Sequence, residues 1–175
     1  LSVRARDRDA KAVAELEDRQ PEHLPKPDLE RMRALAVLLA DPQLTYPTIH
    51  VTGTNGKTTT VRMLAHIMKL MGRRVGMTST DGIVVDGRLI KKGDMSGPKS
   101  AQMVLQNPTV DTAVFEVARG GILREGLGYD RNDGAVVTNV TGDHLGLGGI
   151  DSLGQLANVK GVVVEAVPRS GTAVL

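Results

Sequence analysis

Residues 51–60 read Val-Thr-Gly-Thr-Asn-Gly-Lys-Thr-Thr-Thr, and this stretch decides the class of fold. A strand-like run at 48–51 precedes it, and apolar residues at helical spacing follow it over 61–71. A strand, a glycine-containing turn and a Lys-Thr pair that opens a helix are typical of a phosphate-binding loop. The sequence therefore predicts an α/β domain of the P-loop type, with this loop at the end of a strand.

The residue types in the loop suit phosphate chemistry. Gly53 and Gly56 allow the tight turn that brings backbone N–H groups close to phosphate oxygens. The start of the helix adds unpaired N–H groups and the positive end of the helix dipole. We expect Lys57 to reach the β- and γ-phosphates of ATP and the Thr58 hydroxyl to ligate Mg²⁺. The predicted nucleotide-binding residues of the loop are Gly53, Thr54, Asn55, Gly56, Lys57, Thr58 and Thr59.

The spacing differs from the common pattern G-x-x-x-x-G-K-S/T, because Val51 stands where that pattern has its first glycine. The alternative interpretation is a glycine turn followed by a surface lysine. The strand and the helix that flank the loop favour phosphate binding.

Composition narrows the class of protein. The 175 residues suffice for one α/β domain, and 41% hydrophobic content predicts a folded chain. With two Tyr, one Phe and no Trp, the core must be aliphatic. A net charge of +2 and so few aromatic residues argue against a nucleic-acid partner.

The chain has no cysteine, which excludes disulfides, thiolate catalysis and cysteine-bound zinc. No apolar run approaches the roughly 18 to 20 residues that cross a bilayer, and the first residues lack the apolar segment of a secretory signal. We therefore expect a cytoplasmic protein with no membrane partner. The start at Leu1 and the strand-like end at 172–175 predict a piece of a longer polypeptide.

The order of elements predicts two parts. Residues 1–27 form a charged segment with a helix around 7–19 and a proline-containing linker. A central domain follows over 28–175 and opens with an amphipathic helix at 28–41. Further strands are predicted at 75–78, 112–117 and 134–140, and a hairpin is predicted from strands at 83–85 and 89–90. Helices are predicted at 99–106 and 152–166. Residues 94–98 are predicted to form a loop, and residues 120–128 a loop or a short helix. This alternation predicts a three-layer domain with a mostly parallel sheet and helices on both faces.

Ligands of such open sheets bind outside the carboxyl ends of the strands. Polar residues follow four predicted strand ends, at 53–58, 78–81, 116–119 and 139–144. We expect these four sets to converge on one site.

Glu116 ends an otherwise apolar strand, where a carboxylate is costly unless it is paired or binds a cation. Beside a phosphate-binding loop, Mg²⁺ is the natural partner, and the alternative is an ion pair with Arg119 or Arg124. Asp143 and His144 follow the next buried strand. A histidine and a carboxylate there can ligate a second Mg²⁺ or orient a nucleophile, and the alternative is a structural histidine.

Together these residues resemble the Mur ligase superfamily, whose members join an acid to an amine using ATP. The resemblance rests on the loop 53–59, Glu116, Asn139, Asp143-His144 and Lys160. Within the superfamily, the strings at 77–82, 93–98, 118–128 and 137–146 are most similar to the Mur-ligase-like part of cyanophycin synthetase. Residues 29–35 and 46–53 look more like folylpolyglutamate synthase, which leaves the substrate open.

The resemblance implies a reaction through an acyl phosphate, which an incoming amine converts to an amide. It implies ATP and Mg²⁺ as cofactors, and a small-molecule or peptide carboxylate plus an amino-acid amine as partners. The implied catalytic residues are Lys57, Glu116, His144 and Lys160, the implied metal ligands are Thr58, Glu116 and His144, and Asn139 joins the loop in binding nucleotide. Lys160 occupies the place of a lysine that many members carbamylate; as an isolated residue it would be a solvated lysine.

Family members also close a C-terminal domain over the nucleotide, so we expect the domain to be incomplete and the isolated chain not to complete a turnover. The alternatives are a folylpolyglutamate synthase-like ligase, a nucleotide-binding module without catalysis, and a general P-loop ATPase or kinase. The oligomeric state stays open.

Overall fold

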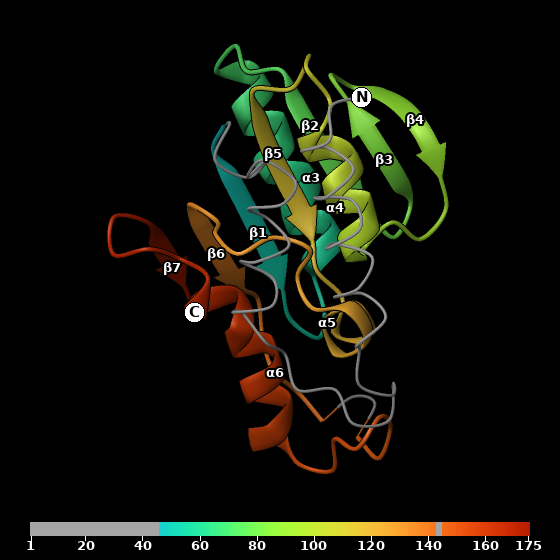
Figure 1. Ribbon diagram of the computed structural model, residues 1–175, viewed down its shortest axis with the longest axis vertical. Helices are drawn as coiled ribbons and strands as arrows, with labels where there is room; N and C mark the ends of the chain where they lie inside the picture. Colours follow the sequence, from blue (N-terminus) through green and yellow to red (C-terminus); the bar gives the residue numbers. More distant parts are fainter. Residues whose placement is uncertain (1–45, 143–144) are drawn as a thin grey trace, which may run out of the picture.

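The computed structural model describes residues 46–142 and 145–175, so the predicted helices at 7–19 and 28–41 and the pair Asp143-His144 lie outside the described residues. Within that part the strands form one sheet in the order β4-β3-β2-β5-β1-β6-β7 (Figure 1). The strands are β1 Thr48–Thr52, β2 Val75–Ser79, β3 Gly82–Val85, β4 Arg88–Lys92, β5 Thr112–Glu116, β6 Gly134–Val137 and β7 Thr172–Val174. Neighbours from β2 to β7 run parallel, and the β3–β4 hairpin adds two antiparallel strands at one edge.

Helices cover both faces of the sheet, as predicted. The helices of the described part are α3 Lys57–Leu70, α4 Pro98–Leu105, α5 Arg119–Glu125 and α6 Leu153–Glu165. β5 shows how the faces divide, because successive side chains of a strand point to opposite sides. Val114 packs in the cluster that contains Val61 of α3, whereas Phe115 packs with Ile122 of α5 and Leu156 of α6. The prediction of a three-layer α/β domain is confirmed.

Local boundaries differ from the predicted ones for identifiable reasons. β6 ends at Val137 and not at 140, because Val137 pairs with the last residue of β1, Thr52, and the chain then turns toward the loop that follows β1. Pro98 begins α4 and does not end the preceding loop, since proline fits the first turn of a helix. The glycine-bounded stretch at 120–128 forms a short helix, α5, over most of its length. No helix in the described part is both long and apolar enough to span a bilayer.

A fully buried histidine lies in the middle of β1. The His50 ring packs against Tyr129 at a centroid distance of 3.9 Å and against the edge of Phe115 at 5.0 Å. Neither of its ring nitrogens has a hydrogen-bond partner in the described part of the chain. Burial lowers the pKa of His50 from 6.5 to about 3, so this imidazole stays neutral in the folded protein.

Stability should therefore fall as the pH drops below 6.5. Between pH 6.5 and about 3 the unfolded chain binds a proton on His50 that the folded chain does not, which lowers the free energy of unfolding by about 1.4 kcal/mol per pH unit. Urea unfolding at pH 7 and pH 5 measures this loss, which we expect to be about 2 kcal/mol. The variant His50→Leu takes up no such proton and should show a flatter pH dependence. Equal slopes for the two proteins would contradict the assignment.

Candidate nucleotide-binding site

The loop between β1 and α3 adopts the conformation that its glycines permit. Gly53 has a φ of 142° and Gly56 a φ of 81°, both in the region that side chains disfavour. No side chain caps the start of α3, so the N–H groups of its first turn point toward the loop without a side-chain acceptor. The Lys57 ammonium donates to the carbonyl oxygens of Gly53 at 3.1 Å and Thr54 at 2.9 Å, which keeps it across the mouth of the loop.

The segment after β6 holds the loop from the other side. The backbone N–H of Asn55 donates to Asn139 Oδ1, and Asn139 Nδ2 donates back to the carbonyl of Asn55, both at 3.0 Å. The Thr54 N–H donates to the Asn139 carbonyl at 2.9 Å, and the Thr138 hydroxyl donates to the Asn55 carbonyl at 2.6 Å. Asn139, predicted as a nucleotide contact, thus uses its side-chain amide to fix the backbone of the loop.

A polar cluster joins the start of α3 to the ends of β5 and β2. The Thr58 hydroxyl donates to Glu116 Oε2 at 2.8 Å, and the Thr80 N–H donates to the same oxygen at 3.3 Å. The two threonine hydroxyls are 3.2 Å apart. Glu116 is only 3% exposed, and Thr58 and Thr80 both donate to its carboxylate. The predicted convergence of the strand ends is confirmed for the sets at 53–58, 78–81 and 116–119, and Asn139 joins them.

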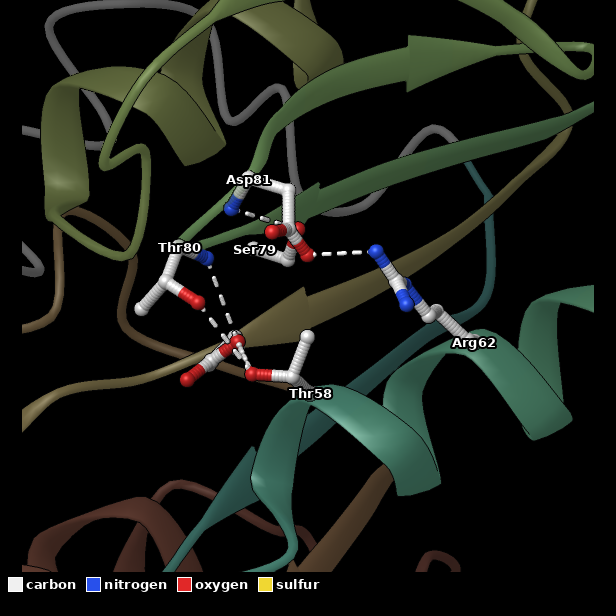
Figure 2. A network of polar contacts seen from close by, with 6 residues as sticks. Thr58, Arg62, Ser79, Thr80 and Asp81 are labelled. Carbon is white, nitrogen blue, oxygen red and sulfur yellow. Dashed lines mark hydrogen bonds and ion pairs between the residues drawn. The ribbon is translucent and has the colours of Figure 1, made fainter.

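An ion pair that sequence reasoning missed fixes the turn after β2. Arg62, one turn along α3 from Thr58, donates to Asp81 Oδ2 at 2.6 Å, and Figure 2 shows this pair beside Thr58 and Thr80. Both side chains are more than half exposed, so the pair adds little to stability by itself. The Asp81 N–H donates to Ser79 Oγ at 3.2 Å. The pair therefore positions the turn that aims the Thr80 N–H at Glu116. The only sequence signal for this pair was the four-residue spacing from Thr58 to Arg62, which places Arg62 on the same face of α3 as Thr58.

Lys160 is a buried lysine, not the solvated one that its position alone would suggest. It lies on α6, a helix that begins with a capping box between Ser152 and Gln155, and it is 3% exposed. Within the described residues it makes no ion pair. Burial, together with the positive charges of Lys57 and Arg119, lowers the pKa of Lys160 to about 8. A large fraction of this amine is therefore neutral near pH 8.

The donor set fits a magnesium nucleotide. Mg²⁺ in phosphate sites is held by one or two protein oxygens, with phosphate oxygens and water completing the octahedron. Thr58 and Glu116 place a hydroxyl and a carboxylate oxygen 2.8 Å apart beside the phosphate loop. Among the described residues, no group of three or more His, Cys, Asp or Glu side chains could hold a metal ion by itself. A metal ion at this site would therefore need phosphate oxygens and water as further ligands. His144, the predicted ligand of a second Mg²⁺, lies outside the described residues.

Comparison with known proteins agrees with this geometry. Residues 51–175 match the family described as the Mur ligase middle domain. The cyanophycin synthetase of Trichormus variabilis is 57% identical over 129 residues, which cover 74% of this chain and 14% of that protein. The dihydrofolate synthase/folylpolyglutamate synthase of Mycobacterium tuberculosis is 28% identical over 191 residues, covering 86% of this chain and 39% of that protein.

Among solved structures, a folylpolyglutamate synthase from Mycobacterium tuberculosis, complexed with ADP and AMPPCP, superimposes with a TM-score of 0.60 at 25% identity. The superposition covers 93% of this chain and 44% of that one. This chain therefore spans less than half of each of these relatives, and about a seventh of the cyanophycin synthetase.

Proposed function

Because this chain belongs to the Mur ligase middle domain family, we propose that it is the ATP-binding core of a carbon–nitrogen ligase of the cyanophycin synthetase type. The observation that carries the proposal is the cluster in which the first turn of α3 meets Glu116 and Thr80 beside the phosphate loop. The identity to cyanophycin synthetases, which spans most of the described residues, supports the choice among Mur-type ligases.

Each residue of the site has a defined task in this proposal. Lys57 and the N–H groups at the start of α3 bind the β- and γ-phosphates, with Asn139 holding the loop in shape. Thr58 and Glu116 would hold Mg²⁺, and the ion would supply positive charge beside the transferring phosphoryl group. Thr80 keeps the Glu116 carboxylate aimed at the loop. His144 is proposed as a further metal ligand on family resemblance.

The reaction consists of two transfers. An oxygen of the substrate carboxylate attacks the γ-phosphorus of ATP, the bond to the β-phosphate oxygen breaks, and ADP leaves. The nitrogen of an incoming amino acid then attacks the carbonyl carbon of the acyl phosphate. Inorganic phosphate leaves and the nitrogen loses a proton, which completes the amide. Such phosphoryl transfer depends on positioning and charge neutralisation, which these residues supply.

The buried amine of Lys160 should react with carbon dioxide. Only the neutral amine attacks CO₂, and the nitrogen then loses a proton to leave a carbamate anion. Because the pKa of Lys160 lies at about 8, the carbamate should grow with pH through that value. We expect a carbamate carbonyl signal in ¹³C NMR of the protein in ¹³C-bicarbonate. Its absence at pH 8 to 9, or its persistence in Lys160→Ala, would show that Lys160 is not modified. Lys69→Ala, which removes an exposed lysine, is the matched control.

The two alternatives are a folate ligase and a nucleotide-binding module without catalysis. The larger share of the chain covered by the folylpolyglutamate synthase match, 86% against 74%, favours a folate acceptor. A nucleotide-binding role without catalysis would leave ATP binding intact and amide formation undetectable. The chain spans 14% of the cyanophycin synthetase, so ligase activity is to be tested with a polypeptide that also supplies the remaining ligase domains.

The deciding experiment measures ATP-dependent phosphate release by that polypeptide with two acceptors. One arm contains an Asp–Arg peptide with aspartate or arginine, and the other a reduced folate with glutamate. Turnover only with the peptide is the expected result. Turnover only with the folate would contradict the peptide ligase and show that the protein is a folate ligase. No turnover in either arm, with ATP still bound, would favour the non-catalytic role.

A further inference from the structure

β4 forms one edge of the sheet, and no strand of the described residues 46–142 and 145–175 lies on its outer side. Among the described strands it pairs with β3 alone, and Figure 1 shows the β3–β4 hairpin at the border of the sheet. All five residues of β4 are exposed, with Leu89 and Ile90 at 58% and 59%. An uncovered edge strand presents free N–H and C=O groups that can pair with another extended chain.

The same strand carries unneutralised positive charge. Arg88, Lys91 and Lys92 are exposed, and none of them takes part in an ion pair with a described residue. The two carboxylates that flank the strand are engaged elsewhere: Asp86 lies 3.8 Å from the Lys69 ammonium, and Asp94 accepts from Ser96. A chain that pairs along β4 would therefore meet three cations on five residues.

The strand also points at the nucleotide site. β4 runs from the turn at 86–87 toward Gly93, whose N–H donates to the Asp81 carbonyl at 3.1 Å. Two residues on, the Met95 N–H donates to the Ser79 carbonyl at 2.9 Å. Residues 79–81 form the turn that directs the Thr80 N–H to Glu116. The end of β4 is thus tied to the turn that supports the metal-binding carboxylate.

From these three features we infer that β4 is the docking strand for the acceptor, an extended peptide with a carboxylate on every second residue, as in an Asp–Arg peptide, that pairs parallel to β4 with its carboxyl end toward Gly93. The inference rests on the proposed ligase function, which is the reason for choosing the parallel direction. A peptide parallel to β4 places its C-terminal carboxylate toward the nucleotide site. Main-chain pairing supplies affinity, and the three cations favour peptides with carboxylates along the paired segment.

The distance to be bridged sets a length requirement. A peptide paired on the outer side of β4 would lie three strand spacings, roughly 14 Å, from β2, a distance that about four extended residues span. Five further residues pair along β4 itself. Acceptors of about nine or ten residues therefore engage both places, whereas a dipeptide reaches only the nucleotide site.

Lysines on an edge strand have another established use, which is to discourage aggregation. That use requires no selectivity for acidic chains and no main-chain pairing. The two explanations are separated by probes that change charge and backbone hydrogen bonding independently.

The test measures binding of fluorescent decapeptides to the complete 175-residue chain by anisotropy, without nucleotide. The first probe alternates aspartate and threonine; the second has the same sequence with four consecutive central nitrogens methylated, so that it keeps every carboxylate but cannot pair along an edge. The protein variants are Lys91→Gln with Lys92→Gln, and as a matched control Arg131→Gln with Arg169→Gln, two exposed arginines outside β4.

We expect the lysine variant to bind the first probe about tenfold more weakly and the arginine control to bind it like the wild type. We also expect the methylated probe to bind the wild type at least about tenfold more weakly than the first. Equal weakening by both double variants would show diffuse charge attraction and overturn the docking strand. Equal binding of the two probes would exclude strand pairing and overturn it as well.

The proposed ligase function is scored separately, by ATP binding and phosphate release of a polypeptide that contains this chain together with the remaining ligase domains, since the isolated chain is not expected to turn over. Peptide binding as predicted with no ATP-dependent turnover would refute the ligase and leave the docking strand standing. ATP-dependent turnover, with equal binding of the first and the methylated probe, would support the ligase and refute the docking strand.

Discussion

Replacing Lys57 with alanine is expected to lower ATP-dependent amide formation about a thousandfold, while the protein stays folded. The ammonium of Lys57 lies across the mouth of the loop, 2.9 Å from the Thr54 carbonyl, and no other lysine of the loop can replace it. Its loss removes a full positive charge from the place where the γ-phosphoryl group carries developing negative charge. The measurement is phosphate release and amide formation in the longest polypeptide that contains this chain, with ATP affinity measured by calorimetry.

Lys69→Ala is the matched control for this prediction. Lys69 lies at the other end of the same helix, is half exposed, and pairs with Asp86 at 3.8 Å. Its removal should leave turnover within about twofold of the wild type, since an exposed ion pair contributes little. Unchanged turnover in Lys57→Ala would mean that the loop does not serve an ATP reaction, and the ligase proposal would fail.

Replacing Gly53 with alanine should unfold the nucleotide loop and lower the free energy of unfolding by about 3 kcal/mol. A side-chain carbon at Gly53 would overlap the Thr138 hydroxyl and approach the backbone nitrogens of Thr138 and Asn139 at 3.1 and 3.2 Å. Backbone atoms cannot rotate away as a long side chain can. The φ of 142° adds strain of its own. Urea unfolding and ADP affinity of this chain measure both consequences.

Gly56→Ala separates backbone strain from crowding at the same loop. Gly56 also has a positive φ, 81°, but a side-chain carbon there meets nothing within 4 Å. The expected loss is about 1 kcal/mol, the cost of a left-handed alanine alone. If Gly53→Ala were no worse than Gly56→Ala, the close approach of the segment after β6 to the loop would not hold the loop in place.

The parallel sheet and the phosphate loop were predictable from the sequence because both depend on local patterns. Apolar β-branched runs mark buried strands, and a Gly-Lys-Thr string between a strand and a helix has one common structural use. Glu116 stood out for a local reason as well, since a carboxylate at the end of an apolar strand needs a partner. The rule that ligands meet the carboxyl ends of parallel strands then brought the separate sets together.

The partners of these residues were not predictable, because they depend on strand order and on side-chain burial. Only the position of β5 between β2 and β1 brings the Thr80 N–H to Glu116. The Arg62–Asp81 pair joins two elements whose contact no local pattern encodes. The burial of Lys160, and with it the lowered pKa, follows from how α6 packs on the sheet. The strand pattern around His50 likewise gave no sign that its ring nitrogens would lack a hydrogen-bond partner among the described residues.

The reciprocal bonds between Asn55 and Asn139 also bear on how the protein forms. The two residues are 84 positions apart, so the phosphate loop leaves the ribosome long before the residue that braces it. Pairings between such distant segments slow folding, because a long stretch of chain must close first. A nascent chain stopped before Asn139 carries the whole Gly-Lys-Thr string yet lacks a braced loop. The ability to bind nucleotide should therefore arise late in synthesis, in one step with the docking of β6.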